Sequence, residues 1–175
     1  MKTETFNQRY LAFTKPFVDS VKEIYSTMMA TEIHQGKALY KREDIGFSHD
    51  YLTIMGISGT FTAQDEKHDF RGNLVLSWPL QTYLNTAGAM MQEEYTEIND
   101  EIADVGMEIC NITMGGAKAT LAQVGFSVDM SIPTSVSGNN IDISAQASAT
   151  TILVPFSSDL GNFNLELNYE EPSEK

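Results

Sequence analysis

Residues 51–79, YLTIMGISGTFTAQDEKHDFRGNLVLSWP, contain the pattern that decides the fold. Two segments rich in apolar and β-branched residues, 51–61 and 70–78, flank a polar stretch, which predicts two strands joined by a turn. Pro79 ends the second strand and suits the first turn of a helix that we expect to extend to about Met91. Consecutive strands joined in this way are antiparallel neighbours, because parallel strands need a long crossover connection.

Upstream of this pair, the chain predicts a helix followed by a short strand. Thr14 is a candidate N-cap, and Pro16 suits an early helical position. Apolar residues then recur at helical spacing, which predicts an amphipathic helix over about 15–31: Phe17, Val21, Ile24 and Met28. Residues 37–41 follow as a strand.

Downstream, the chain predicts one long helix and then strands only. Asn99 is a candidate N-cap for a helix over about 100–124, which Gly125 ends. We expect a turn at Gly138-Asn139-Asn140 and a strand over 141–156. In the last strand four apolar residues alternate with three polar ones, which is typical of a half-buried strand: Phe163, Leu165, Leu167 and Tyr169 alternating with Asn164, Glu166 and Asn168.

The order of these elements predicts the fold class. Strands follow one another in hairpins instead of alternating with helices, which favours an α+β domain with a mostly antiparallel sheet and helices packed on one face. No linker or low-complexity stretch divides the chain, so we expect a single domain over residues 1–175. The ends, 1–13 and 170–175, are expected to be poorly ordered.

Composition excludes several classes of function. The 175 residues contain 11 Lys and Arg against 24 Asp and Glu, a formal charge of −13, which argues against binding to nucleic acid or to an anionic membrane surface. The first nine residues contain no apolar run, so we expect no secretory signal there, and no stretch of the sequence is apolar over the length that a membrane span requires. Cys110, the only cysteine, is interpreted as a structural thiol, and we expect a cytoplasmic protein.

The helix predicted over 100–124 carries an unusual polar stripe. Asp104, Glu108, Asn111 and Gly115 are spaced by four, three and four residues, so they lie along one face. The core face beside it is Ile102, Val105, Ile109 and Ile112. Stacked carboxylates repel each other, and an internal Asn and the pair Gly115-Gly116 both disfavour a helix. The stripe is therefore either an ordinary solvated face or a functional site.

The motif Asp104-x3-Glu108-x2-Asn111, followed by Gly115-Gly116-Ala117-Lys118 and by Pro133-Thr134, resembles the CheX subgroup of the CheC/CheX/FliY family of chemotaxis phosphatases. The resemblance covers nearly the whole chain, and the segments that carry it extend from Gly59-Thr60-Phe61 and 72–79 to 152–156 and Gly161. Two features depart from the family pattern. The residue before the motif Glu is usually Gly, whereas here it is Met107, with Gly106 one place earlier. The gap of 21 residues between Asn111 and Pro133 is one residue shorter than is usual in the family.

The resemblance implies hydrolysis of the aspartyl phosphate of a phosphorylated CheY-like response regulator. The regulator would supply the phosphoryl group, Mg²⁺ and an active-site lysine, so this chain would have no metal or cofactor of its own. By similarity, Asn111 would orient the attacking water and Glu108 would pair with the regulator's lysine. Asp104, Gly115 and Gly116 would contact the partner.

Other possibilities remain at this point. The same fold also suits a non-catalytic adaptor or switch module that only binds a response regulator. A self-contained metal-dependent hydrolase is disfavoured, because His34, His49 and His68 stand apart with no metal-ligand spacing. Members of the family commonly form homodimers through sheet edges, and we expect the same here without being able to name the strand.

The first predicted helix contains an echo of the motif. Asp19-x3-Glu23-x2-Ser26 has the same spacing, with Ser in the place of Asn. A hydroxyl lacks the paired donor and acceptor of an amide. We therefore predict no second site there.

Overall fold

The computed structural model describes residues 2–41, 49–141 and 149–171, with side chains from Tyr10 onward. The elements in these ranges follow the predicted order of a helix, a group of strands, two helices and a second group of strands. They are α1 (Lys2–Met29), β1 (His34–Gln35), β2 (Leu39–Tyr40), β3 (His49–Ala63), β4 (Glu66–Trp78), α2 (Leu80–Met91), α3 (Val105–Gln123), β5 (Phe126–Met130), β6 (Thr134–Ile141), β7 (Thr150–Ser158) and β8 (Gly161–Glu170).

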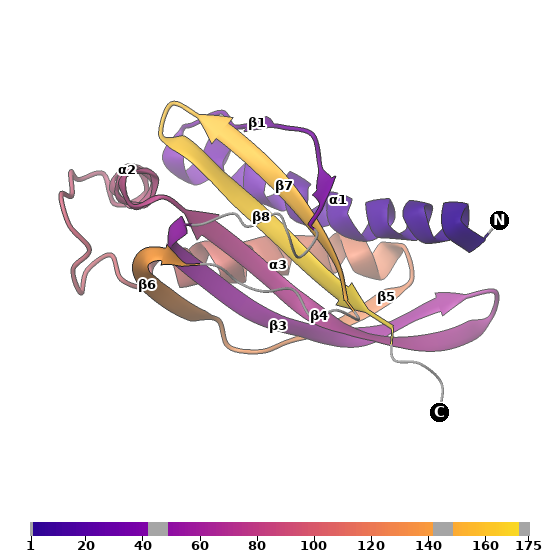
Figure 1. Ribbon diagram of the computed structural model, residues 1–175. Helices are drawn as coiled ribbons and strands as arrows, with labels where there is room; N and C mark the ends of the chain where they lie inside the picture. Colours follow the sequence, from indigo (N-terminus) through magenta and orange to yellow (C-terminus); the bar gives the residue numbers. More distant parts are fainter. Residues whose placement is uncertain (1, 42–48, 142–148, 172–175) are drawn as a thin grey trace.

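The described strands form one sheet in which all the pairings are antiparallel. The order across it is β1-β7-β8-β4-β3-β5, with β2 also paired to β7 and β6 to β3. Helices α1 and α3 lie behind the sheet and α2 lies at one end of it (Figure 1). The predicted fold class is therefore confirmed.

The hairpin β3–β4 is the centre of the sheet and matches the segment that predicted the fold. The strands pair from Tyr51 with Trp78 to Ala63 with Glu66, and Gln64 and Asp65 turn the chain with positive φ of 53° and 67°. Gly72 allows the next strand to approach, because a Cβ there would lie 1.8 Å from the Asn168 carbonyl oxygen. Long, regular pairing of this kind gives the helices a continuous surface to pack on.

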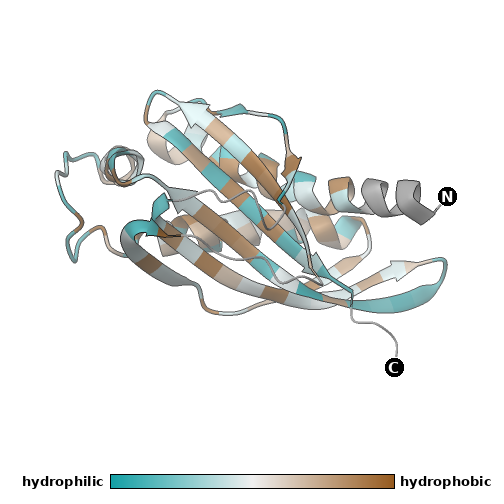
Figure 2. Cartoon of the chain, in the orientation of Figure 1, coloured by the Kyte–Doolittle hydropathy of each residue, from teal (hydrophilic) through white to brown (hydrophobic). Residues whose placement is uncertain are grey.

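The core lies between the helices and the inner face of the sheet. Apolar and polar residues alternate along the strands (Figure 2). Phe13 of α1 makes ring contacts with three strands at centroid distances of 5.2–5.5 Å, through Phe70, Phe126 and Tyr169. Aromatic clusters bury a large apolar area per residue, so this contact fixes α1 across β4, β5 and β8.

The predicted start of α1 is wrong. The helix begins at Lys2, Pro16 lies inside it, and Thr14 is a buried helical residue instead of an N-cap. The upstream turns persist because Tyr10 and Phe13 are buried, and the Tyr10 hydroxyl donates to the Tyr169 carbonyl at 2.9 Å. Tertiary packing of this size outweighs the cost of one proline in a helix.

Two strand predictions also need correction. The expected turn at Gly138-Asn139-Asn140 lies inside β6. Of the strand expected over 141–156, the structure shows β7 from Thr150 onward, while residues 142–148 lie outside the described ranges, as do 172–175 at the end of the chain. The local tendency of these residues to turn appears as an irregularity in the pairing: Ser137 pairs with Tyr51 and Ile141 with His49, so residues 138–140 lie opposite one residue of β3, and Asn140 has a φ of 53°.

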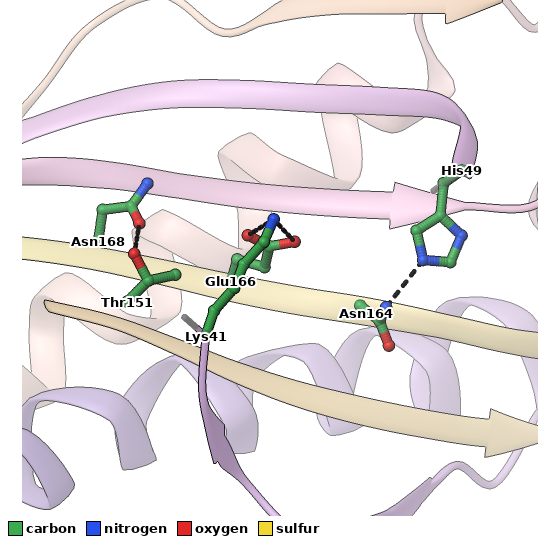
Figure 3. Close-up of polar contacts among 6 residues, drawn as sticks. All are labelled: Lys41, His49, Thr151, Asn164, Glu166 and Asn168. Atoms are coloured by element: carbon green, nitrogen blue, oxygen red, sulfur yellow. Dashed lines mark hydrogen bonds and ion pairs between the residues drawn. The ribbon is translucent and has the colours of Figure 1, made fainter. Parts of the chain in front are cut away.

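Strand β8 alternates as predicted, but it is buried on both faces. Its polar row, Asn164, Glu166 and Asn168, is as inaccessible as its apolar row. Figure 3 shows the reason: Glu166 forms an ion pair with Lys41 at 3.1 Å, Asn168 accepts from Thr151, and Asn164 contacts His49 at 2.8 Å. Each of these three polar side chains has a polar partner. The alternation of polar and apolar residues, which is typical of a strand with one face in solvent, is therefore found here in a strand that is buried on both faces.

None of the helices in the described ranges combines the length and the apolar character that crossing a membrane requires.

Candidate functional site

Helix α3 begins five residues later than predicted. Asn99 does act as a cap, because its Oδ1 accepts from the backbone N–H groups of Glu101 at 3.0 Å and Ile102 at 3.2 Å. The capped segment is a separate turn, however, and the helix starts at Val105. The site therefore lies on the first turns of α3 and on the residue just before it.

Two tyrosines explain the break between the turn and the helix. The Tyr83 hydroxyl donates to the Ile102 carbonyl at 2.5 Å, and the Tyr51 hydroxyl donates to the Ala103 carbonyl. In a continuous helix these carbonyls would accept from N–H groups four residues later. Instead, the Gly106 N–H donates to the Tyr83 hydroxyl at 3.2 Å.

The two tyrosines form one buried unit beneath the start of α3. Tyr51 comes from β3 and Tyr83 from α2, and their rings stack with centroids 3.6 Å apart and planes at 15°. Burial, and secondarily the neighbouring Tyr51, raises the pKa of Tyr83, so its phenol stays protonated as the donor. We call Tyr51 and Tyr83 the tyrosine anchor.

Gly106 allows α3 to approach this anchor. A Cβ at this position would lie 2.6 Å from both Tyr51 Cε1 and Thr53 Oγ1, which is too close for any side chain. Packing therefore requires a glycine at position 106 in this chain, one place before the position where the family usually has its glycine. Met107, the next residue, is half-buried.

One side of α3 is built into the core. Its buried residues include Val105, Ile109, Cys110, Met114 and Leu121. Of the predicted core face, Ile102, Val105 and Ile109 are buried and Ile112 is half-buried. Burial raises the pKa of the Cys110 thiol to about 12, so the thiol is protonated at neutral pH, in agreement with a structural role.

The other side presents the predicted motif to solvent. Asp104, Glu108, Asn111 and Gly115 are all exposed. The Glu108 N–H donates to the Asp104 carbonyl at 3.1 Å, so Asp104 continues the helical geometry although it precedes α3. The structure thus keeps the four residues in line on one accessible face, which we call the motif face.

The two glycines that follow the motif differ in their surroundings. No atom lies within 4 Å of a Cβ built at Gly115, so its surroundings are open. A Cβ at Gly116 would lie 2.4 Å from Ser20 Oγ on α1. Gly116 therefore has a packing function between α1 and α3, whereas Gly115 leaves a gap in the motif face.

The chemistry of the motif face follows from its side chains. The Asn111 amide offers both a donor and an acceptor, and Glu108 offers a negative charge one turn away. In the part of the chain that the structure describes, no three His, Cys, Asp or Glu side chains come together as metal ligands. The face can orient a polar molecule and pair with a cation brought by another protein.

Sequence reasoning identified the motif face but missed the tyrosine anchor. Tyr51 and Tyr83 lie far from the motif in sequence, and nothing in the local pattern links them to it. The sequence offered one indication of their role: Tyr51 is at the start of a predicted strand, and Tyr83 is within the helix predicted after Pro79.

The structure therefore shows an α+β domain whose anchored helix α3 exposes an acid–amide pair, Glu108 and Asn111. The family model described as "Chemotaxis phosphatase CheX" matches residues 63–157, which include all of α3. The chain belongs to this family.

Individual relatives agree with this assignment. The chain is 28% identical to the CheY-P phosphatase CheX of Thermotoga maritima over 127 residues, which cover 72% of this chain and 76% of the relative. A CheC-like chemotactic protein from Shewanella oneidensis has 31% identity and a TM-score of 0.78, with 92% of this chain and 99% of that one covered. The CheX–CheY–BeF3–Mg²⁺ complex of Borrelia burgdorferi contains a chain with 25% identity and a TM-score of 0.74, at 91% and 98% coverage.

Proposed function

We propose that this chain is a phosphatase that hydrolyses the aspartyl phosphate of a CheY-like response regulator. The observation that carries the proposal is the exposed Glu108–Asn111 pair on an anchored helix inside the family match. Two relatives add support, since one is a CheY-P phosphatase and another occurs in a complex with CheY.

In the proposed reaction, Asn111 enters the regulator's active site and holds the attacking water. The water oxygen attacks phosphorus in line with the aspartyl oxygen, the phosphorus–oxygen bond breaks, and inorganic phosphate leaves. An amide suits this task because it donates and accepts hydrogen bonds without bringing a charge near the phosphoryl oxygens. Its exposure on α3 allows it to reach into a partner's site.

Glu108 is proposed to pair with the active-site lysine of the regulator. It lies one turn before Asn111, so the pair would fix the register in which the amide enters. A rim ion pair of this kind contributes to specificity and to the rate of association more than to affinity.

The neighbouring residues are proposed to shape the contact. Asp104 would lie at the edge of the docked regulator, and the open surroundings of Gly115 would let the partner's backbone come close. Gly116 would support the surface from below through its contact with Ser20, and any direct contact with the partner would be limited to its exposed backbone. Mg²⁺ would be bound by the regulator, and this chain would contribute no ligand to it.

We also propose a homodimer, formed through the edge of the sheet at β6. Among the described strands, β6 pairs with β3 alone, and apolar side chains lie exposed beside this edge. Ile132, which precedes it, is 89% exposed, and Met130 and Val136 are also exposed. Edge pairing would cover these side chains. A setting in the cytoplasm, where response regulators act, is part of the same proposal.

The proposed function is tested by phosphate release. The purified chain is mixed with phosphorylated CheY-like regulators in the presence of Mg²⁺, and inorganic phosphate is followed over time. We expect acceleration above the regulator's own rate for at least one regulator, and none without a regulator. Release from a small-molecule phosphate alone would indicate a self-contained hydrolase and would contradict the proposal.

A binding measurement separates the phosphatase from an adaptor. A regulator stabilised as a BeF3 complex is titrated with the chain. Binding together with phosphate release supports the phosphatase, whereas binding with no acceleration for any regulator would identify a non-catalytic binding module.

The proposed dimer is tested by sedimentation equilibrium of the wild type and of Ile132→Lys. A lysine beside the β6 edge should shift the protein from dimer to monomer.

A further inference from the structure

A groove of about 470 Å³ lies on the far side of α1 from the β5 edge of the sheet, between α1 and the segment that carries β2. We call it the α1 groove. Its floor and walls include Thr14, Val18 and Lys22 of α1, Leu39 of β2, and Ile152 and Val154 of β7. Its volume is within the range of sites that hold small molecules.

Regular spacing makes the groove continuous. Leu11, Thr14, Val18 and Lys22 recur every three or four residues, so they line one face of α1. Ile152 and Val154 are alternate residues of β7 and therefore face the same side of the sheet. The groove thus has apolar side chains along its length and on both walls.

Exposed apolar side chains gather at its mouth. Leu11 is 65% exposed, Leu39 38% and Tyr40 51%, and all three line the groove. Large apolar side chains from separate elements that converge on one concave surface are typical of a binding site. The concavity distinguishes this surface from scattered exposed residues, which need no explanation.

The floor contains a buried hydroxyl with no partner. Thr14 is 6% exposed and lines the groove, and its Oγ1 makes no hydrogen bond with any described residue. Buried hydroxyls in folded proteins are nearly always hydrogen-bonded. An oxygen atom of a bound molecule would supply the missing acceptor.

The rim carries positive charge. Lys15 and Asp19 of the rim form an ion pair, whereas Lys22 makes no ion pair with a described residue and donates to Gln35 Oε1 at 3.2 Å. One cationic side chain therefore stays available at the mouth of an apolar groove, in a chain whose formal charge is −13. Lys22 could therefore pair with an anionic group at the mouth of the groove, whereas most of the surface of this acidic chain would repel such a group.

We propose that the α1 groove binds an aliphatic carboxylate of roughly ten carbon atoms, a length suited to a small-molecule pocket of this size. Its chain lies against Val18, Leu39 and Val154, and its carboxylate accepts hydrogen bonds from Lys22 and from Thr14 Oγ1. This proposal does not depend on the phosphatase activity, because the groove and the motif face use different residues.

Decanoate is the probe for this proposal, titrated into the intact chain by isothermal calorimetry at concentrations below micelle formation. We expect saturable binding of one decanoate per chain, with binding at least tenfold weaker for decanol, which has the same tail without the charge. Thr14→Val and Lys22→Gln should each weaken decanoate binding about fivefold.

Lys118→Gln, an exposed lysine of α3, is the matched control and should bind decanoate like the wild type. Thermal unfolding of each variant shows that it is folded. Thr14→Val changes only an unpartnered hydroxyl, so it is expected to fold normally.

Three results would overturn the proposal: no saturable binding, equal binding of decanoate and decanol, or unchanged binding by both groove variants. The α1 groove could instead be occupied by a second copy of this chain, and sedimentation velocity distinguishes this case from binding of a carboxylate. If decanoate dissociates a self-associated form of the protein, the groove is an interface between copies and the proposed ligand is wrong.

Discussion

Helices α1 and α3 carry the same spacing of acidic and polar residues but differ in what surrounds it. Asp19, Glu23 and Ser26 of α1 are exposed, as are Asp104, Glu108 and Asn111 at the start of α3. On α1, Asp19 is paired with Lys15 and the third side chain is a hydroxyl. The α3 triplet ends in an amide.

The two motifs also lie at opposite ends of their helices. Glu108 is in the first turn of α3, where the helix dipole favours the approach of an anion. Glu23 and Ser26 lie in the last two turns of α1, where the dipole disfavours it. The position that corresponds to Gly115 is Ala30, which follows the end of α1 and has a φ of 49°. The spacing of the residues is therefore not enough to form a site for a phosphoryl group. The site also depends on which end of the helix carries the motif, on the chemistry of the third side chain and on how the helix is held against the rest of the fold.

The largest effect is expected from Asn111→Ala. Removing the amide that holds the water should lower turnover of the phosphorylated regulator about 100-fold, which corresponds to about 2.7 kcal/mol of transition-state stabilisation. Binding to the BeF3-stabilised regulator should stay near wild type. Ser26→Ala is the matched change on α1 and should leave turnover unchanged. Equal losses in the two variants would mean that the motif faces are not different in function.

Glu108→Ala is expected to have the next largest effect. Loss of the proposed ion pair should weaken binding and lower turnover, each by roughly tenfold, with a smaller effect at high salt because exposed pairs are screened. The measurement is turnover as a function of regulator concentration at two ionic strengths. Glu23→Ala provides the comparison on α1, and a loss there of similar size would argue that α1 takes part in docking.

Tyr83→Phe tests the tyrosine anchor. It leaves the Gly106 N–H without its partner and removes one of the two donors to the Ile102 carbonyl, the other being the Val105 N–H at 3.2 Å, so we expect a loss of about 1–3 kcal/mol in stability and a severalfold fall in turnover. Tyr10→Phe is the control: it removes a buried hydroxyl that donates to the Tyr169 carbonyl at 2.9 Å, between α1 and β8 and outside the anchor. It should cost similar stability in urea unfolding without reducing turnover. A fall in turnover for both variants would show that general loosening, and not the anchor, is responsible.

Gly115→Ala is expected to have the smallest effect. The added methyl group meets no described atom, so helix propensity should raise stability by up to about 1 kcal/mol. If the regulator comes close at this point, the same methyl group should weaken binding a few-fold. Gly116→Ala is the control, since its Cβ crowds Ser20 and should lower stability instead. Unchanged regulator binding in Gly115→Ala would remove this residue from the proposed contact.

Local patterns predicted most of the fold. The hairpin β3–β4, the helix after Pro79 and the alternation of β8 were all readable from the sequence, because period-two patterns and prolines act over a few residues. The start of α1, the continuation of β6 through Gly138 and the burial of Glu166 were not. Each of these depends on a partner more than 80 residues away: Tyr169 for Tyr10, β3 for β6 and Lys41 for Glu166.

The sequence by itself determined which side chains could carry the chemistry. The four-three-four spacing of Asp104, Glu108, Asn111 and Gly115 follows from the periodicity of a helix and needs no tertiary information. Only the tertiary structure decided where that helix starts and how it is held. The Tyr51 and Tyr83 hydroxyls take two backbone carbonyls that a continuous helix would use, and Gly106 lets the chain approach them. Hydrogen bonds between segments distant in sequence compete with the local hydrogen bonds of a helix. Here the distant hydrogen bonds replace the local ones, because burial strengthens the bonds that the tyrosine hydroxyls make.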